Sequence, residues 1–369
     1  MDIFSLIHTA RSMDASDLHL ITDSPPLVRV SGSLQTMDGL APLNPDDTRE
    51  AFLQITSNEQ KKHFHEHLEL DFGYSVPATG RLRCNVAQQR GSVSLALRLL
   101  PPEVSTIDEL ELPGIYKDLI LKQRGLIVVT GPTGSGKTTT QAAMLHHLNV
   151  TEGRHIVTIE DPIEYVHNNI KCAITQRQLG SDTHSFASAL RHILRQDPDV
   201  ILVGEIRDTD TAAAVLSIAE TGHLVLTTGH APSTNQAVER VIDLFPPHER
   251  DLAQKRLASL LLAVLCQQLI PRADGTGRIA ASEIMLANPA VRNLIREGKH
   301  YQLPSVICTH QDIGMTSMDE SLVNLYKGGK IGLENLLKFC KDEQEVNRLI
   351  GRKRRAGTST ILQNTPSKN

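Results

Sequence analysis

An eight-residue stretch near the middle of the chain has the residue types and spacing of a loop that holds phosphate groups. It fits the pattern G-x-x-x-x-G-K-[ST] at every fixed position and reads Gly131-Pro132-Thr133-Gly134-Ser135-Gly136-Lys137-Thr138, with Thr139 directly after it. Glycines let the backbone curl so that successive N–H groups face one point, and a following helix adds its positive end. We expect Lys137 to reach the β and γ phosphates of a bound nucleotide and the Thr138 hydroxyl to bind Mg²⁺.

Two acidic clusters supply the carboxylates that such a loop needs as partners. One kind of carboxylate holds the water shell of Mg²⁺, and another orients the attacking water. The first cluster contains Glu160, Asp161 and Glu164, and the second contains Glu205. Each follows a short apolar run, and ligands of open α/β sheets bind where the strands end. Arg207 follows Glu205 and either contacts phosphate or pairs with a carboxylate.

Two histidines flank a further apolar run at 224–227. His223 precedes this run, and His230 follows it together with a pair of threonines. A hydroxyl pair and an imidazole at the end of a strand are placed to sense a γ-phosphate. A metal role for the histidines is not favoured, because no second His or Cys stands at ligand spacing.

The elements that position these residues alternate between strand and helix. Short apolar runs predict strands buried on both faces at Gly125–Thr130, His155–Ile159, Val200–Val203 and Leu224–Thr227. Helix-like segments follow at Thr138–Asn149, Ser185–Gln196 and Thr209–Glu220. This alternation predicts an α/β fold with a parallel sheet and right-handed crossovers.

The regions on either side of this core have different patterns. Before it, strands and a helix-like stretch at Asn44–Leu68 predict a small α+β domain; after Pro246 the pattern is mostly helical, apart from a strand at Arg278–Met285. We therefore expect an N-terminal domain, a linker, a core, a mostly helical C-terminal region and a flexible tail, at 1–105, 106–112, 113–286, 287–350 and 351–369.

Composition limits the possible partners and the compartment. The 369 residues include 38 Lys+Arg and 42 Asp+Glu, a net charge of −4, so we expect no nucleic-acid partner. The basic run Arg352–Arg355 is short and typical of a solvated end. The N-terminus lacks the pattern of a secretory signal, the longest apolar run is too short to cross a bilayer, and the five cysteines are scattered. We expect a cytoplasmic protein.

With these segments in place, the chain resembles the secretion-type hexameric ATPases, and within them the PilT-type retraction ATPases of type IV pili. That family carries a Walker A loop, an Asp box, a Walker B segment with Glu, and a His box. Here they read GPTGSGKTTT, TIEDPIEYVH, DPDVILVGEIRD and TGHLVLTTGH, in the family's order. One position departs from the pattern, because the His box usually reads T-L-H-T and this chain has Gly229 before His230.

The resemblance assigns roles to residues at the matching positions. It implies a PAS-like N-terminal domain, a RecA-like P-loop ATPase core, and ATP bound between the two. Glu205 would be the Walker B glutamate acting with Mg²⁺ and water, and Glu164 the second residue tied to hydrolysis. His223 and His230 would form the His-box pair. Arginines of the N-terminal domain reach the phosphates in such enzymes, and the candidates on the matching strands are Arg81, Arg83 and Arg98.

The resemblance also implies an activity and an assembly. We expect a homohexameric, ATP-hydrolysing motor for pilus retraction that acts at the inner face of the cytoplasmic membrane through a platform protein. A paralogous accessory ATPase is a further candidate partner. The segment Ala290–Glu297 resembles a helix typical of the retraction type, and the tetracysteine element of the extension ATPases is absent. Alternatives are a motor for pilus assembly, secretion or DNA movement on the same ring, and a slow ATP-dependent regulator of another motor.

Overall fold

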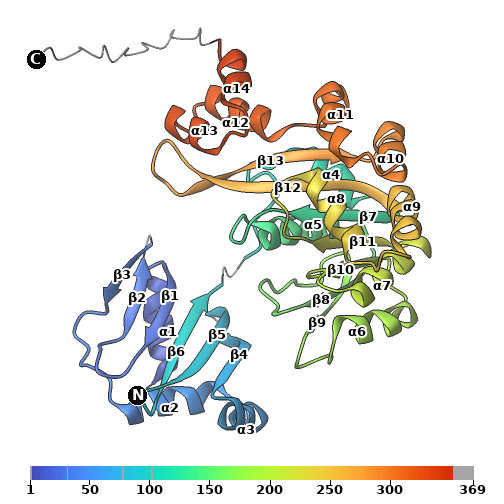
Figure 1. Ribbon diagram of the computed structural model, residues 1–369. Helices are drawn as coiled ribbons and strands as arrows, with labels where there is room; N and C mark the ends of the chain where they lie inside the picture. Colours follow the sequence, from blue (N-terminus) through green and yellow to red (C-terminus); the bar gives the residue numbers. More distant parts are fainter. Residues whose placement is uncertain (1, 31, 77–78, 101–102, 352–369) are drawn as a thin grey trace, which may run out of the picture.

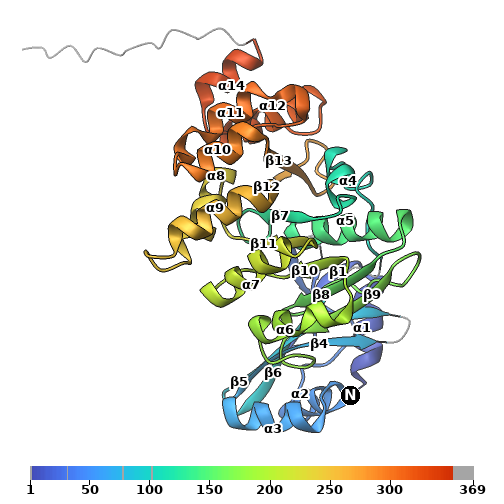
Figure 2. The ribbon, with the colours of Figure 1, turned by 90° about the vertical axis from the view of Figure 1, so that its right-hand side faces the viewer.

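The chain folds into two helix-covered sheets, one built from about the first hundred residues and one from the rest (Figures 1 and 2). The computed structural model describes residues 2–30, 32–76, 79–100 and 103–351. The α/β class predicted from the sequence is confirmed, as are a separate N-terminal unit and a helical C-terminal region. The expected tail lies outside the described residues from position 352 onward. No helix in the described ranges is long and apolar enough to pass through a lipid bilayer.

The N-terminal sheet is antiparallel throughout and has the strand order β3-β2-β1-β6-β5-β4. Its strands are β1 Ala15–Leu20, β2 Leu27–Val30, β3 Ser33–Thr36, β4 Glu69–Val76, β5 Gly80–Gln89 and β6 Ser92–Leu99. Its helices are α1 Ile3–Ser12, α2 Pro45–Ile55 and α3 Asn58–His67, and they share one hydrophobic core with the sheet.

Strand alternation decides which face of this sheet carries the charges. Leu82, Cys84 and Val86 of β5 are buried in the core with Leu97 and Leu99 of β6. Because side chains alternate between the two faces of a strand, the residues between them lie on the opposite face. Those residues include all three arginines that were predicted to reach the phosphates.

The expected single helix over 44–68 is wrong, because the structure has two helices there. α2 ends at Ile55, and Ser57 begins α3 with a reciprocal cap: Gln60 N donates to Ser57 Oγ at 3.2 Å, and Ser57 N donates to Gln60 Oε1 at 2.8 Å. Two orphan backbone donors are satisfied in this way, which favours a new helix start over continuation.

The larger sheet has the order β13-β12-β7-β11-β10-β8-β9, with all neighbours parallel except β12 and β13. Its strands are β7 Gly125–Thr130, β8 His155–Glu160, β9 Ala173–Gln178, β10 Val200–Val203, β11 Leu224–Thr228, β12 Leu261–Pro271 and β13 Arg278–Leu286. The first four predicted strands correspond to β7, β8, β10 and β11, and the apolar runs are indeed buried on both faces.

Helices cover both faces of this sheet. On one face, alternate strand residues such as Ile127 and Leu202 pack against α4 Ile115–Ile120 and α5 Lys137–Thr151. The residues between them, such as Val128 and Ile201, belong to a core on the other face. Helices of this core include α6 Phe186–Ile193, α7 Thr209–Glu220, α8 Thr234–Asp243 and α9 Arg250–Leu260. A short 3₁₀ helix, η1 Leu194–Gln196, extends α6.

The region after Pro246 contains a strand that the sequence reading missed. The apolar run at 257–266 belongs half to α9 and half to β12, because Leu261 already has extended backbone angles. Apolar runs of this length fit a buried helix as well as a buried strand, so periodicity could not separate them. The expectation of mostly helical structure with one strand is therefore corrected to two strands, β12 and β13, which pair from Ala263 opposite Leu286 to Pro271 opposite Arg278.

Beyond β13 the chain is helical and packs on the outer end of the larger sheet (Figure 1). The helices are α10 Pro289–Arg296, α11 Leu303–Thr309, α12 Met318–Lys327, α13 Leu333–Phe339 and α14 Glu343–Leu349, with 3₁₀ turns η2 His300–Gln302 and η3 Gln311–Ile313. At the other boundary, Ile107 and Leu112 of the range expected as a linker are buried beside Tyr116 in the core of the larger unit.

Candidate active site

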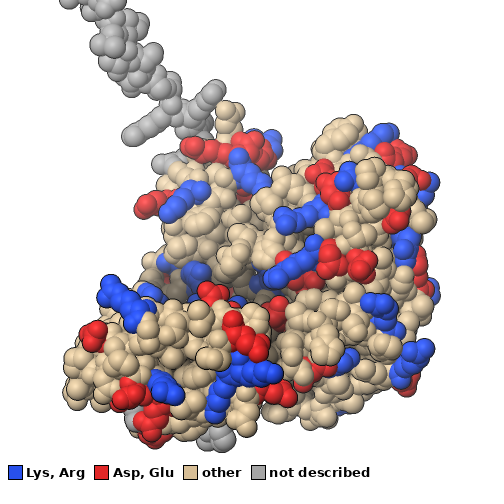
Figure 3. Space-filling view, turned by 60° about the horizontal axis from the view of Figure 1, so that its bottom comes forward, with Lys and Arg blue, Asp and Glu red and all other residues tan. Residues whose placement is uncertain are grey.

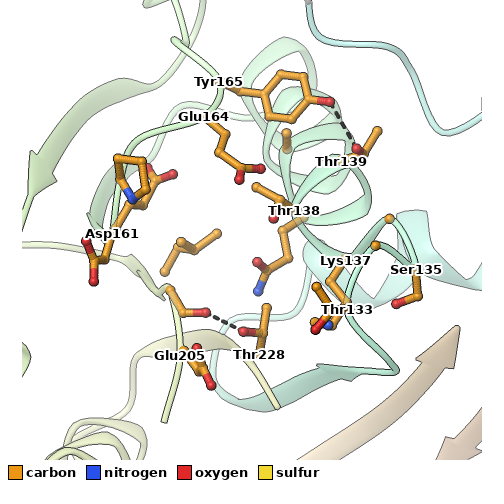
Figure 4. Close-up of a pocket in the computed structure, with 18 of the residues that line it drawn as sticks. Thr133, Ser135, Lys137, Thr138, Thr139, Asp161, Glu164, Tyr165, Glu205 and Thr228 are labelled. Carbon is orange, nitrogen blue, oxygen red and sulfur yellow. Dashed lines mark hydrogen bonds between the residues drawn. The ribbon is translucent and has the colours of Figure 1, made fainter. Parts of the chain in front are cut away.

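A cavity of about 610 Å³ lies where the N-terminal unit meets the carboxyl ends of the parallel strands. Acidic and basic side chains gather around the hollow between the two units (Figure 3). The loop at 133–139 lines the cavity on one side, and Glu160, Asp161, Glu164 and Glu205 line it on another. Figure 4 shows the labelled loop residues on one side of the cavity and Asp161, Glu164 and Glu205 around the rest of it. The structure thus brings the phosphate-loop pattern and both acidic clusters into one place.

The phosphate loop has the curled backbone that its glycines predict. Gly131, Gly134 and Gly136 have φ of 141°, 76° and 88°, which side-chain-bearing residues rarely adopt. A Cβ on Gly131 would stand 2.3 Å from the carbonyl oxygen of Gln267, so this position has no room for a side chain. Gly136 is the N-cap of α5. The buried Ser135 Oγ has no hydrogen-bond partner within the described chain. The arrangement leaves backbone donors and a helix N-terminus facing the cavity.

Lys137 points back into its own loop. Its Nζ donates to the carbonyl oxygens of Gly131 at 2.9 Å and Pro132 at 3.0 Å. Burial lowers the pKa of Lys137, and the nearby charge of Glu205 opposes that effect. A buried ammonium held by neutral carbonyls interacts more favourably with an anion, so its position is suited to a phosphate oxygen.

The first acidic cluster contains carboxylates in two different environments. Glu160 is buried at the end of β8, where its Oε1 accepts hydrogen bonds from Thr158 at 2.6 Å and Gln176 at 3.1 Å. Burial raises the pKa of Glu160. Glu164 lies nearer to solvent, and its Oε1 is 4.0 Å from Arg83 of the N-terminal unit. Glu164 therefore faces a positive charge across the cavity.

Each carboxylate oxygen of Glu205 has a side-chain nitrogen close to it. Arg207 Nε donates to its Oε2 at 2.8 Å, and His230 Nε2 lies 3.2 Å from its Oε1. These contacts orient the carboxylate without burying it. Gly229 has no positive φ, and a Cβ there would meet Thr130 Oγ1 at an ordinary 3.6 Å. The departure from the family's His-box pattern therefore leaves His230 beside Glu205.

The predicted arginines divide into two groups. Arg83 and Arg98 line the cavity and stand directly opposite each other on β5 and β6. Like charges at such a pair repel, and a bound anion would relieve that repulsion. Arg98 is also held by Asp17, with Nε 3.0 Å from Oδ1. Arg81 does not line the cavity. Its guanidinium instead donates hydrogen bonds to the Ile163 carbonyl oxygen and to Gln178 Oε1.

His223, a predicted site residue, also lies away from the cavity. It precedes β11, so it sits at the amino edge of the sheet, where Nδ1 contacts the Thr221 hydroxyl at 2.9 Å. A five-residue strand separates its two ends by roughly 16 Å. The pair His223 and His230 is therefore split across the sheet, and only His230 is at the cavity.

Comparison with known proteins places this arrangement in a family. The model of the family described as "Type II/IV secretion system protein" matches residues 89–323. The "Type IV pilus retractation ATPase PilT" of Pseudomonas aeruginosa is 44% identical over 92% of this chain and 98% of its own length. The chain belongs to the family of type II/IV secretion system proteins. A "Twitching motility protein" of Neisseria gonorrhoeae, another relative, is 42% identical over 94% of this chain and 92% of its own length.

A solved structure agrees with this family assignment. The crystal structure titled "Pilus Retraction Motor PilT and Bound ADP" has a TM-score of 0.88 and 41% identity, and the match covers 94% of this chain and 99% of that one. The resemblance to the PilT-type ATPases, the RecA-like core and the ATPase class are confirmed. The described fold is that of a secretion-type ATPase.

Several cavity residues of this secretion ATPase were not found from the sequence. Tyr165 is one, and its hydroxyl lies 2.9 Å from Thr139 Oγ1 (Figure 4). Gln141 is another, a buried side chain whose Nε2 has no partner in the described residues. Helical spacing could have identified Gln141 from the sequence, because it follows Lys137 by four positions and so lies on the same face of α5.

His167 also lines the cavity and leads to a prediction about stability. Burial lowers its pKa to about 4, while an exposed histidine titrates near 6.5. The unfolded chain therefore binds a proton before the folded chain does, so the free energy of unfolding falls as the pH drops from 6.5 to 4. The expected loss is about 3 kcal/mol at pH 4.

Denaturant unfolding of the nucleotide-free protein across this pH range measures the effect. His167→Phe should flatten the slope, because no imidazole remains to be protonated. The exposed His65, changed to Gln, is the control and should keep the wild-type slope. Equal slopes for wild type and His167→Phe would contradict the prediction.

Proposed function

We propose that this chain is the ATP-hydrolysing motor that powers retraction of type IV pili. The observation that carries the proposal is the position of the cavity. One unit contributes the phosphate loop and the acidic side chains, and the other contributes Arg83 and Arg98. A nucleotide held there touches both units, so the loss of its γ-phosphate changes the contacts between them. The names of the relatives and of the matching structure supply the process that such a motor drives.

The proposed binding mode follows from the donors around the cavity. The loop backbone and Lys137, within the lining segment 133–139, receive the phosphates, with Thr139 next to them. Arg83 and Arg98 approach the phosphates from the N-terminal unit, and Arg207 and His230 approach from the strand ends. Positive and N–H groups on opposite sides thus surround the same anion, which favours a closed arrangement of the two units when ATP is bound.

Magnesium fits the oxygen donors of this site. The Thr138 hydroxyl and the carboxylates of Glu160, Asp161 and Glu205 line the cavity, and Mg²⁺ prefers oxygen ligands. Within the described ranges, no three His, Cys, Asp or Glu side chains are grouped so that they could hold a metal ion. We assign Thr138 and Glu205, partly through water, as its protein ligands. When bound, the ion neutralises phosphate charge.

Hydrolysis is assigned to Glu205, with help from Glu164. Arg207 and His230 fix the Glu205 carboxylate, so it is oriented before the substrate arrives. Its role is to position the water that attacks the γ-phosphate and to accept a proton from it. Glu164 Oε1 lies 4.0 Å from Arg83 of the N-terminal unit, so a change in the contacts of Glu164 alters the interaction between the two units. Chemistry and domain position are thereby linked.

The assembly and the partners belong to the same proposal. Six copies form a ring, and the ring acts at the inner face of the cytoplasmic membrane through a platform protein of the pilus machinery. A second, paralogous ATPase is a further candidate partner, because the "Type IV pilus ATPase PilU" of Pseudomonas aeruginosa is 38% identical over 95% of this chain.

Gene deletion in the host organism tests the direction of the motor. Retraction predicts that cells without the gene carry more surface pili by electron microscopy and lose twitching motility. Complementation with the wild-type gene should reverse both changes, and the Lys137→Ala gene should reverse neither. Cells without pili would instead identify an assembly motor. Unchanged pili and motility would contradict both and favour secretion or an accessory role.

A further inference from the structure

Arg81 occupies a contact between the two units that differs from those of its neighbouring arginines. It lies on the same face of β5 as Arg83 but bends away from the cavity. Its Nε donates to the carbonyl oxygen of Ile163 at 2.8 Å, and its Nη2 donates to Gln178 Oε1 at 2.6 Å. Both partners belong to the larger unit, more than 80 residues along the chain.

Gln178 joins Arg81 and Ile163 in a junction of three residues. Its Oε1 also accepts a hydrogen bond from Ile163 N at 3.3 Å. Gln178 is itself buried and fixed at the end of β9, where its backbone N donates to Asp182 Oδ2 at 2.7 Å. Both backbone polar groups of Ile163 are therefore satisfied by Arg81 and Gln178. The position of Ile163 depends on these two side chains.

The N-terminal unit holds the guanidinium tightly. Ser75 Oγ accepts a hydrogen bond from Arg81 Nη1 at 3.2 Å. Gly73 lies on the other side, and a Cβ there would stand 2.4 Å from Arg81 Nη2 and 2.9 Å from Gln178 Oε1. Gly73 has no positive φ, so its backbone does not require glycine. The absence of a side chain at 73 instead makes room for the junction.

Ile163 stands directly before Glu164, in the loop that also carries Asp161. We propose that Arg81 is a positioning residue that holds the Glu164 loop in its hydrolysis-ready place while the two units are closed. Rotation of the units would separate Arg81 from Ile163 and Gln178, and would release the loop. Arg81 therefore makes hydrolysis depend on domain position, whereas Arg83 and Arg98 serve the nucleotide itself. The inference rests on the proposed role of Glu164 in the motor.

Steady-state ATPase kinetics on the full-length assembly separate positioning from phosphate binding. Arg81→Ala should lower kcat roughly 10- to 100-fold, as expected when a reacting group is displaced by about an ångström. KM for ATP and the Kd of a non-hydrolysable ATP analogue should stay within about twofold. Arg81→Lys should recover part of kcat at most, because one ammonium does not reproduce the planar fork that meets both acceptors. Raised KM and Kd with unchanged kcat would overturn the proposal and make Arg81 a phosphate ligand.

Gly73→Ala provides a second route to the same displacement without removing a charge. The new methyl group should push the guanidinium aside and lower kcat in the same direction as Arg81→Ala. Gln178→Leu should do likewise, and the double variant Arg81→Ala with Gln178→Leu should be no worse than either single variant, because both remove one junction. Strictly additive losses would contradict a shared junction.

Hydrogen exchange shows whether the loop is released. In Arg81→Ala, backbone amides at 161–165 should exchange faster than in wild type, while amides of β7 should not change. Exposed Arg49 of α2, changed to Ala, is the matched control and should leave kinetics and exchange unchanged. If wild type hydrolyses ATP and Arg81→Ala matches it in every measurement, this inference fails, while the proposed motor function still stands. If Glu164→Gln retains full turnover, the proposed role of Glu164 fails instead.

Discussion

Glu205→Gln is expected to bind ATP with near wild-type affinity and to hydrolyse it 10²- to 10⁴-fold more slowly, the usual contribution of a positioned base. Glutamine keeps the size of the side chain, and its amide oxygen can still accept the hydrogen bond from Arg207. The negative charge that orients and deprotonates water is lost. Single-turnover hydrolysis, combined with equilibrium binding of a fluorescent nucleotide, measures the two effects separately.

A neighbouring acidic residue provides the control for this experiment. Asp208 lies three positions after Glu205 but caps α7, where its Oδ1 accepts a hydrogen bond from Thr211 N at 2.7 Å. Asp208→Ala should cost about 1 kcal/mol of stability and leave turnover largely intact. If Glu205→Gln hydrolyses ATP at the wild-type rate, water activation belongs to another carboxylate of the cavity, and Glu164 becomes the first candidate.

The strands at the centre of the larger sheet were predictable because they are buried on both faces. β7, β10 and β11 are continuous apolar runs, and few other arrangements of so short a run are stable in water. β9 is an edge strand with the sequence Ala-Ile-Thr-Gln-Arg-Gln and only partial burial, so it left no such signal. β12 was hidden for another reason, since α9 leads into it with no turn residue between them.

The acidic residues were predictable for a related reason, and the histidine pair shows the limit of the method. Glu160 and Glu205 follow their strands, and the ends of parallel strands meet at one edge. His223 precedes its strand and so had to lie at the opposite edge, which the order of residues already indicates. The resemblance to a family motif placed both histidines in the site, whereas strand direction separates them.

The roles of the three arginines could not be assigned from sequence. Strand alternation puts Arg81, Arg83 and Arg98 on one face, and no local pattern distinguishes them. The difference comes from Gly73 and from Gln178, which is 97 positions from Arg81. Gln178 lies on β9, one of the two strands of the larger sheet that the sequence did not reveal. Which guanidinium reaches the cavity is decided by packing between units, and local spacing carries no information about that.

Lys137→Ala is expected to weaken ATP binding about 100-fold or more. One charge-assisted hydrogen bond contributes about 1.5–3 kcal/mol, Lys137 is placed for contacts to two phosphates, and each 1.4 kcal/mol is tenfold in affinity. The variant should nevertheless fold as well as wild type. Without nucleotide the ammonium is buried against two carbonyl oxygens, and burial lowers its pKa, so the folded chain gains little from its charge.

Thermal unfolding with and without Mg·ATP distinguishes a binding residue from a structural one. Ligand that binds only the folded chain raises stability by RT ln(1 + [L]/Kd), so wild type should gain several degrees at saturating nucleotide and Lys137→Ala should gain none. Lys171→Ala, at an exposed lysine whose Nζ contacts Thr151, should keep the full gain. A Lys137→Ala protein that unfolds earlier without nucleotide would mean that the ammonium stabilises the loop itself. Retained stabilisation by ATP would mean that the loop backbone alone is sufficient for binding, since its curled N–H groups remain in place without the lysine.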